Sequence, residues 1–161
     1  MKKQSHRAVI GLISDTHGLL RSSVHSAFAG VDIILHAGDV GGDEILTELG
    51  IIAPVHAVCG NTDSVDDPML NHEILMHIAG LSVHVSHGHE VGSPTPERLL
   101  AKYPQDIVIY GHTHRQLITR VGSQLIVNPG AAGQQRFKLL PTVARLTIEN
   151  GTSNVEIIPL D

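Results

Sequence analysis

The sequence predicts an α/β fold in which a parallel sheet covered by helices is followed by mostly antiparallel strands, all packed as one sandwich. In the first part of the chain, short apolar runs alternate with helix-like segments. In the later part, apolar runs are separated by short turn signals instead. No internal repeat or linker interrupts the 161 residues, so we expect one domain spanning residues 1–161.

The first part of the chain is expected to form a β-α-β-α-β unit. The expected elements are strands at 8–14, 33–37 and 54–58 and helices at 21–28 and 43–49. Asp43 and Glu44 open the second helix, where negative charge is favoured by the helix dipole. Since such crossovers join parallel strands, the three strands should form a parallel sheet covered by helices.

The later part of the chain predicts mainly strands. A hairpin is expected from Glu73 to Ser86 around Gly80, and a helix should follow Thr95 as its cap, with Pro96 at its first position. Further strands are expected at 107–110, 116–121, 124–127, 142–148 and 155–158. The pairs Gly122-Ser123 and Asn150-Gly151 are typical of the turns between such strands.

Composition excludes several classes of partner. The net charge of -5 and the 2% aromatic content disfavour binding to nucleic acid polymers or to anionic membrane surfaces, whereas a small phosphate ester fits. Cys59 is the only cysteine, so no internal disulfide can form, and we expect a cytoplasmic location. No apolar run approaches the roughly 20 residues of a membrane-spanning helix.

Polar clusters follow five of the expected strands. They read SDTHG at 14–18, HAGDV at 36–40, CGNTD at 59–63, SHGHE at 86–90 and YGHTH at 110–114. Ligands of open α/β sheets collect beyond the carboxyl ends of the strands. Imidazole combined with carboxylate is the ligand set of Zn, Mn, Fe, Ni or Co, and Ca prefers oxygen alone. The clusters therefore predict a transition-metal site.

Two of these clusters place side chains two residues apart. On an extended strand end, Asp15 with His17, and His112 with His114, would each point to the same side. If the backbone turns there, each pair could instead straddle two ions. Two neighbouring cations need a bridging carboxylate, and Asp39 is the candidate. The two cations together would activate a water for attack at phosphorus.

The ordered blocks resemble a known family. Asp15-x-His17, Gly38-Asp39, Gly60-Asn61, His87-Gly88 and Gly111-His112-x-His114 are similar to the motifs of the calcineurin-like metallophosphoesterase superfamily, most closely its small YfcE-type phosphodiesterases. VNPGA at 127–131 matches their Asn-Pro-Gly loop. One Asp-x-His is a weak signal, but five blocks in order are specific. The resemblance implies a four-layer α/β/β/α sandwich with two mixed β-sheets.

The resemblance also implies a dinuclear site that hydrolyses small phosphate esters through a hydroxide bridging the metals. The first ion would be held by Asp15, His17 and His114, and the second by Asn61, His87 and His112, with Asp39 shared. The expected cofactors are two divalent ions, Mn first, with Ni, Fe, Co, Zn and Mg also compatible.

The chain departs from larger relatives after Asn61. Those relatives have a histidine there that helps to protonate the leaving oxygen, whereas this chain has Thr62, which cannot. Esters with good leaving groups should therefore be preferred. Besides Asp39 and Asn61 at the site itself, His89 and Asp63 are the candidates for assisting catalysis.

Three other residues have simpler interpretations. His36 ends an apolar strand, which favours a hydrogen-bonded supporting role over metal ligation. Cys59 is expected to be a small buried hydrophobe. Asn128 either forms hydrogen bonds near the site or only shapes its Asn-Pro turn.

Two other functions compete with the enzyme. One is a protein-binding scaffold of the same fold, like the retromer subunit that has lost metal-ligating histidines, but this chain keeps every ligand type. The other is an amidohydrolase barrel or a cupin, yet a barrel needs about 250 residues and a cupin lacks the early helices. A homodimer or larger homo-oligomer is compatible with the sequence.

Overall fold

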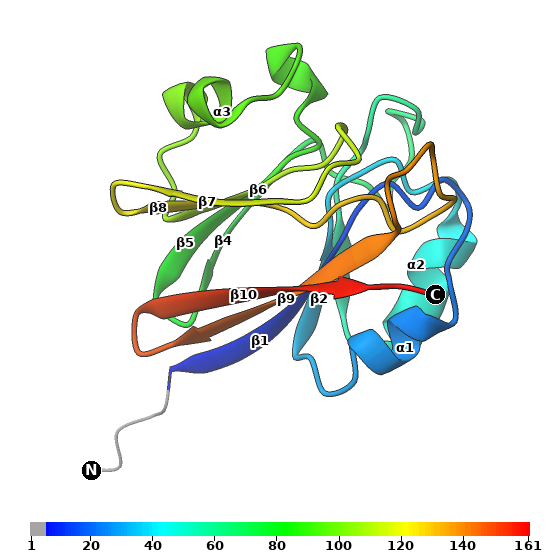
Figure 1. The fold of residues 1–161 in the computed structure, drawn as a ribbon, viewed down its shortest axis with the longest axis horizontal. Helices are drawn as coiled ribbons and strands as arrows, with labels where there is room; N and C mark the ends of the chain where they lie inside the picture. Colours follow the sequence, from blue (N-terminus) through cyan, green and yellow to red (C-terminus); the bar gives the residue numbers. More distant parts are fainter. Residues whose placement is uncertain (1–5) are drawn as a thin grey trace.

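Two five-stranded sheets pack face to face in the computed structural model, which describes residues 6–161 (Figure 1). The strand orders are β10-β9-β1-β2-β3 and β4-β5-β6-β8-β7. The strands of the first sheet are β1 (Arg7–Ile13), β2 (Ile33–His36), β3 (Val55–Ala57), β9 (Thr142–Glu149) and β10 (Thr152–Pro159). The strands of the second sheet are β4 (Ile74–Ile78), β5 (Leu81–Val85), β6 (Ile107–Ile109), β7 (Leu117–Val121) and β8 (Gln124–Asn128).

Helices cover the outer face of each sheet (Figure 1). α1 (Ser23–Ala27) and α2 (Asp43–Ile52) pack on the first sheet, α3 (Pro96–Lys102) packs on the second, and His89–Val91 form a short 3-10 turn, η1. The predicted four-layer α/β/β/α sandwich is thus confirmed. Within residues 6–161, no helix combines the length and apolarity needed to cross a membrane.

Alternating side chains create three apolar layers. Along β1, Ile10 and Leu12 face the second sheet, whereas Val9 and Ile13 face α1 and α2. Along β6, Val108 faces α3 and its neighbours face the first sheet. This alternation follows from the two-residue period of a strand, and burial on both faces explains why these strands read as continuous apolar runs.

Strand pairing follows the prediction in the first part of the chain and differs later. β1, β2 and β3 are parallel, as expected from the β-α-β-α-β unit. The later strands do not stay together, because β9 returns to pair antiparallel with β1 and carries β10 with it. In the second sheet, β6 is parallel to both β5 and β8, so this part is less antiparallel than predicted.

Local signals predicted the turns and caps well. Asn150 and Gly151 both have positive φ (51° and 78°), as a tight hairpin turn requires, and the Thr95 side chain accepts a hydrogen bond from the Arg98 amide at 3.2 Å. The first helix is shorter than predicted. Arg21 lies before α1, where its guanidinium donates to the carbonyl oxygens of Gly133 and Asp161.

Candidate metal centre

The five polar clusters meet at one edge of the sandwich. They follow β1, β2 and β3 of the first sheet and β5 and β6 of the second. Backbone hydrogen bonds join the loops: the Asp15 amide donates to Gly38 O (3.0 Å), the His17 amide to Asp39 O (2.9 Å), and the Gly111 amide to His87 O (2.9 Å). Side chains that are distant in sequence are thereby brought to one place.

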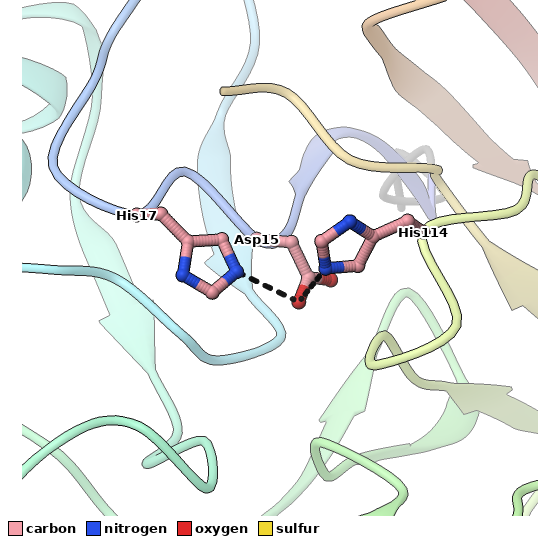
Figure 2. Close-up of side chains that lie close together, drawn as sticks. All are labelled: Asp15, His17 and His114. Atoms are coloured by element: carbon pink, nitrogen blue, oxygen red, sulfur yellow. Dashed lines mark ion pairs between the residues drawn. The ribbon is translucent and has the colours of Figure 1, made fainter. Parts of the chain in front are cut away.

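Asp15, His17 and His114 form the first group of candidate ligands. Figure 2 shows the two imidazoles on either side of the carboxylate, with Asp15 Oδ1 3.7 Å from His17 Nε2 and 3.3 Å from His114 Nε2. Asp15 Oδ2 accepts hydrogen bonds from the Ser14 hydroxyl (2.6 Å) and the His112 amide (3.1 Å). Within residues 6–161, buried Asp15 Oδ1 and His17 Nε2 have no hydrogen-bond partner, which suits atoms that bind a cation.

His87, His112 and Asn61 form the second group. Nδ1 of His87 donates to the carbonyl oxygen of Ala37 (2.7 Å), so in the neutral ring Nε2 is left with a free lone pair. His112 Nδ1 lies 3.3 Å from this Nε2 and 3.1 Å from Asn61 Oδ1. Three potential metal-ligand atoms therefore converge from the loops that follow β3, β5 and β6.

Asp39 lies between the two groups. Its Oδ2 is 3.6 Å from His17 Nε2 in the first group and 3.2 Å from His87 Nε2 in the second. Its Oδ1 accepts a hydrogen bond from the Thr62 amide at 2.9 Å. One oxygen of the Asp39 carboxylate thus faces both groups, while the hydrogen bond to the other oxygen fixes the orientation of the carboxylate.

The electrostatics of the centre favour positive charge. Burial alone would raise the pKa of Asp15, but the nearby imidazoles of His114 and His17 outweigh it and lower this pKa below its usual range. Burial also opposes ionisation of Asp39, yet His87 and the Thr62 amide lower its pKa to about 2. Although burial would lower the pKa of His87, Asp39 and Asp15 raise it. Two ionised carboxylates therefore attract a cation into a buried site.

Five of the seven candidate ligands adopt a left-handed backbone conformation. They are Asp15 (φ 53°), His17 (47°), Asp39 (56°), His112 (71°) and His114 (62°). This conformation is uncommon for residues other than glycine and costs about 1 kcal/mol or more each. The extended-strand alternative for both two-residue spacings is therefore wrong. The backbone turns instead, and it places His112 and His114 in different groups.

Two glycines allow the loops to approach this closely. A Cβ on Gly60 would collide with the Asp39 carboxylate, and one on Gly111 would collide with the Ser14 hydroxyl. Neither position has space for a side chain. The glycines of these two clusters are thus explained by packing of the backbone against the candidate ligands.

His36 supports the centre without facing it, as predicted. Its ring is fully buried, with Nδ1 accepting from the Gly38 amide (3.1 Å) and Nε2 3.0 Å from Thr16 Oγ1. The Thr16 hydroxyl donates to Val40 O (2.7 Å). Burial lowers the pKa of His36 to about 4, so the ring is neutral and Nε2 carries the proton. This chain of hydrogen bonds ties the Asp15 loop to the Asp39 loop.

The two candidate assisting residues have different surroundings. The Asp63 carboxylate accepts hydrogen bonds from the amides of Val40, Gly41 and Gly60 at 2.9–3.2 Å, so it joins the Asp39 loop to its own. His89 is exposed, and its ring centroid lies 5.3 Å from that of His87. Of the two, His89 has its ring free to reach a substrate.

Asn128, Ser14 and Thr16 also support the centre. The amide of Asn128 donates to Gly111 O (3.1 Å) and Thr113 Oγ1 (3.0 Å), which fixes the turn between His112 and His114. Asn128 thus forms hydrogen bonds near the site, and it also shapes its Asn-Pro turn, because its Oδ1 accepts from the Gly130 amide (2.9 Å). Sequence reasoning missed Ser14 and Thr16, because nothing distinguishes a serine or threonine that supports a ligand from one that caps a turn.

Cavities flank the centre on two sides. One of about 500 Å³ is lined by residues that include Asn61, Glu73, His89, Glu90 and Lys102. Another of about 270 Å³ is lined by residues that include His112, His114, Arg115, Arg136 and Phe137. Both contain candidate ligands in their walls, so a bound ester has room on either side.

Comparison with known proteins agrees with this geometry. Residues 9–151 match the family model of the calcineurin-like phosphoesterase superfamily domain. A probable metallophosphoesterase of Methanothermobacter thermautotrophicus is 37% identical over 150 residues, covering 86% of this chain and 80% of that protein. Phosphodiesterase YfcE of Escherichia coli is 36% identical over 85 residues, 48% of this chain and 44% of that protein.

A solved structure shows the same fold. Vacuolar Protein Sorting 29 from Cryptosporidium parvum superimposes with a TM-score of 0.80 at 22% identity, covering 96% of this chain and 98% of that one. The family match spans most of the chain and includes all five polar clusters. The chain therefore belongs to the calcineurin-like phosphoesterase superfamily.

Proposed function

We propose that the chain is a metal-dependent phosphodiesterase that hydrolyses small phosphate esters. The observation that carries this proposal is the pair of buried atoms Asp15 Oδ1 and His17 Nε2, which lie beside the Asp39 carboxylate and have no hydrogen-bond partner within residues 6–161. A fold stabilised only by packing and hydrogen bonds would leave few such atoms, whereas a cation would satisfy both. We also propose that the chain forms a single domain, as the sequence predicts.

Seven side chains would hold two divalent cations. Asp15, His17 and His114 would bind one, Asn61, His87 and His112 the other, and Asp39 both. Bound there, the cations would acidify a water and neutralise charge on the phosphate oxygens. The mixture of nitrogen and oxygen donors suits Mn first, and Ni, Fe, Co, Zn and Mg also fit.

Proton supply limits which esters react well. Thr62 contributes its amide to Asp39 and has no acid to offer, so the departing oxygen depends on other groups. His89, exposed beside His87, is the candidate donor. Aryl esters, whose leaving groups need little protonation, should therefore be turned over faster than alkyl esters.

The test is hydrolysis of bis(4-nitrophenyl) phosphate with Mn(II), with and without chelator. Asp39→Asn should lower both bound Mn and turnover. The loss should exceed the roughly 100-fold that follows when a group hydrogen-bonded to a metal ligand is removed. Asp106→Asn is the matched control, because Asp106 accepts hydrogen bonds from Ser82 and lies outside both candidate ligand groups. Unchanged metal stoichiometry in Asp39→Asn would defeat the shared-ligand assignment. Absence of turnover with Mn, Ni, Co, Fe and Zn would instead favour the protein-binding scaffold.

A further inference from the structure

Two arginines beside the candidate metal centre have side chains without a partner among residues 6–161. Arg115 and Arg136 line the 270 Å³ cavity together with His112 and His114. In the part of the chain from residue 6 onward, neither guanidinium makes a hydrogen bond or an ion pair, although the Arg115 backbone amide does. Both positive charges therefore remain available to a ligand of that cavity.

The other five arginines are all engaged. Arg7 pairs with Glu149, and the rest donate to acceptors elsewhere in the protein, namely Arg21 to Gly133 and Asp161, Arg98 to Ser93, Arg120 to Ser153, and Arg145 to Ala27 and Ala29. A guanidinium presents several donors in a fixed plane, and in these five arginines some of the donors bind acceptors of the protein. The two free arginines are thus set apart from the rest, and both occur in one cavity.

Charge differs between the two sides of the centre. The 500 Å³ cavity contains two carboxylates, Glu73 and Glu90, and one cation, Lys102. The arginine cavity has two cations and no carboxylate among its lining residues. An ester with a second anionic group would therefore be bound with that group on the arginine side, since the opposite side repels it.

We propose that Arg115 and Arg136 bind a second phosphate group of the substrate, carried on the alcohol that stays attached to the cleaved phosphate. This inference rests on the proposed phosphodiesterase function. Guanidinium groups bind phosphate through paired, charge-assisted hydrogen bonds. Phe137, which is 95% exposed at the rim of the same cavity, offers a planar apolar face to a ring on that alcohol. The substrate class is thus a phosphodiester of a phosphorylated nucleoside.

Two chromogenic substrates test this assignment. Thymidine 5′-(4-nitrophenyl phosphate) and its 3′-phosphorylated form release the same 4-nitrophenolate and differ only in the second phosphate. With Mn(II)-loaded protein, we expect kcat/KM to be on the order of tenfold higher for the 3′-phosphorylated form, as charge-assisted hydrogen bonds of this kind predict. Most of this preference should appear in KM, because the second phosphate lies away from the reacting atoms.

Arginine variants test whether Arg115 and Arg136 cause this substrate preference. Arg136→Ala and Arg115→Ala should each reduce the ratio of the two kcat/KM values towards one, and Arg136→Lys should retain part of it. Arg7→Ala is the control, because it removes one exposed arginine from the start of β1, at the end opposite the candidate centre, and should leave the ratio unchanged. A wild-type ratio near one would overturn the proposal. An equal loss with both substrates would also overturn it, since the arginines would then act on the cleaved phosphate or on folding.

Calorimetry separates this inference from the proposed function. Thymidine 3′,5′-bisphosphate should bind about tenfold more tightly than thymidine 5′-monophosphate, and Arg136→Ala should remove the difference. This measurement needs no turnover, so an inactive protein with the binding preference would refute only the phosphodiesterase. Equal affinity for both nucleotides would refute the arginine subsite even if hydrolysis is observed.

Discussion

Replacing His36 by asparagine should change how stability depends on pH. The folded protein keeps this buried imidazole neutral down to about pH 4, whereas in the unfolded chain it takes up a proton near its ordinary pKa of 6.5. Between these values the unfolded state binds more protons, so the free energy of unfolding rises with pH. The stabilisation is complete above pH 6.5 and is lost as pH falls towards 4.

The size of the effect follows from the two pKa values. Each pH unit between them corresponds to about 1.4 kcal/mol, so lowering the pH from neutral to about 4.5 should cost the wild type about 2.5 kcal/mol through His36 alone. Asp15 and Asp39 contribute little in this window, because their ordinary pKa of 3.8 lies below it and their pKa values in the folded protein are lower still. The lowered pKa values of His84 and His112 affect the wild type and the variant alike and cancel in the difference.

Urea unfolding of chelator-treated protein from about pH 4.5 to 7.5 measures this difference. The His36→Asn variant should be less stable at neutral pH, since Thr16 loses its imidazole partner, but its stability should fall less steeply on acidification. His56→Asn, which replaces an exposed histidine of β3, controls for loss of an imidazole. Parallel pH profiles for wild type and His36→Asn would refute the reasoning.

Three further outcomes follow from the contacts around the centre. Gly60→Ala should lower bound Mn and turnover, because its Cβ collides with the Asp39 carboxylate, whereas Gly50→Ala in α2 meets nothing within 4 Å and should add about 0.5–1 kcal/mol of stability in urea titrations. Asp63→Asn should weaken hydrogen bonds to three amides and so lower the urea midpoint, while the pH-rate profile keeps its basic limb; loss of that limb would identify Asp63 as the acid. Chelator should lower the melting temperature by calorimetry, since metal at 100 times its Kd contributes about 2.7 kcal/mol, and an unchanged melting temperature would argue against a metal site.

Local chemistry made much of the fold predictable. Apolar periodicity located the strands, and residues with special backbone preferences, such as Thr95 before Pro96 and Gly151 after Asn150, located the ends of elements. Partner choice between distant strands left no comparable local signal. The alternation of β9 would suit either sheet, so its pairing with β1 is decided by packing of the whole chain.

The candidate site was predictable in residue type but not in geometry. The order of aspartate, asparagine and histidine after the strands indicated which side chains would meet. It did not reveal the left-handed backbone at Asp39 or His112, because neither residue type requires it. The role of Asp63 was hidden as well, since two of the amides it binds belong to Val40 and Gly41 in another loop. The ligand assignments themselves remain predictions until metal content is measured.

The position of β1 between β2 and β9 has a consequence for synthesis on the ribosome. β1 and β2 are close in the chain and can pair as soon as both are made, but the antiparallel neighbour of β1, β9, is made only after β2 to β8. Until then, one edge of β1 has no paired strand. Nascent chains that stall before β9 would carry an open, aggregation-prone edge, so they depend on chaperones more than the released protein does.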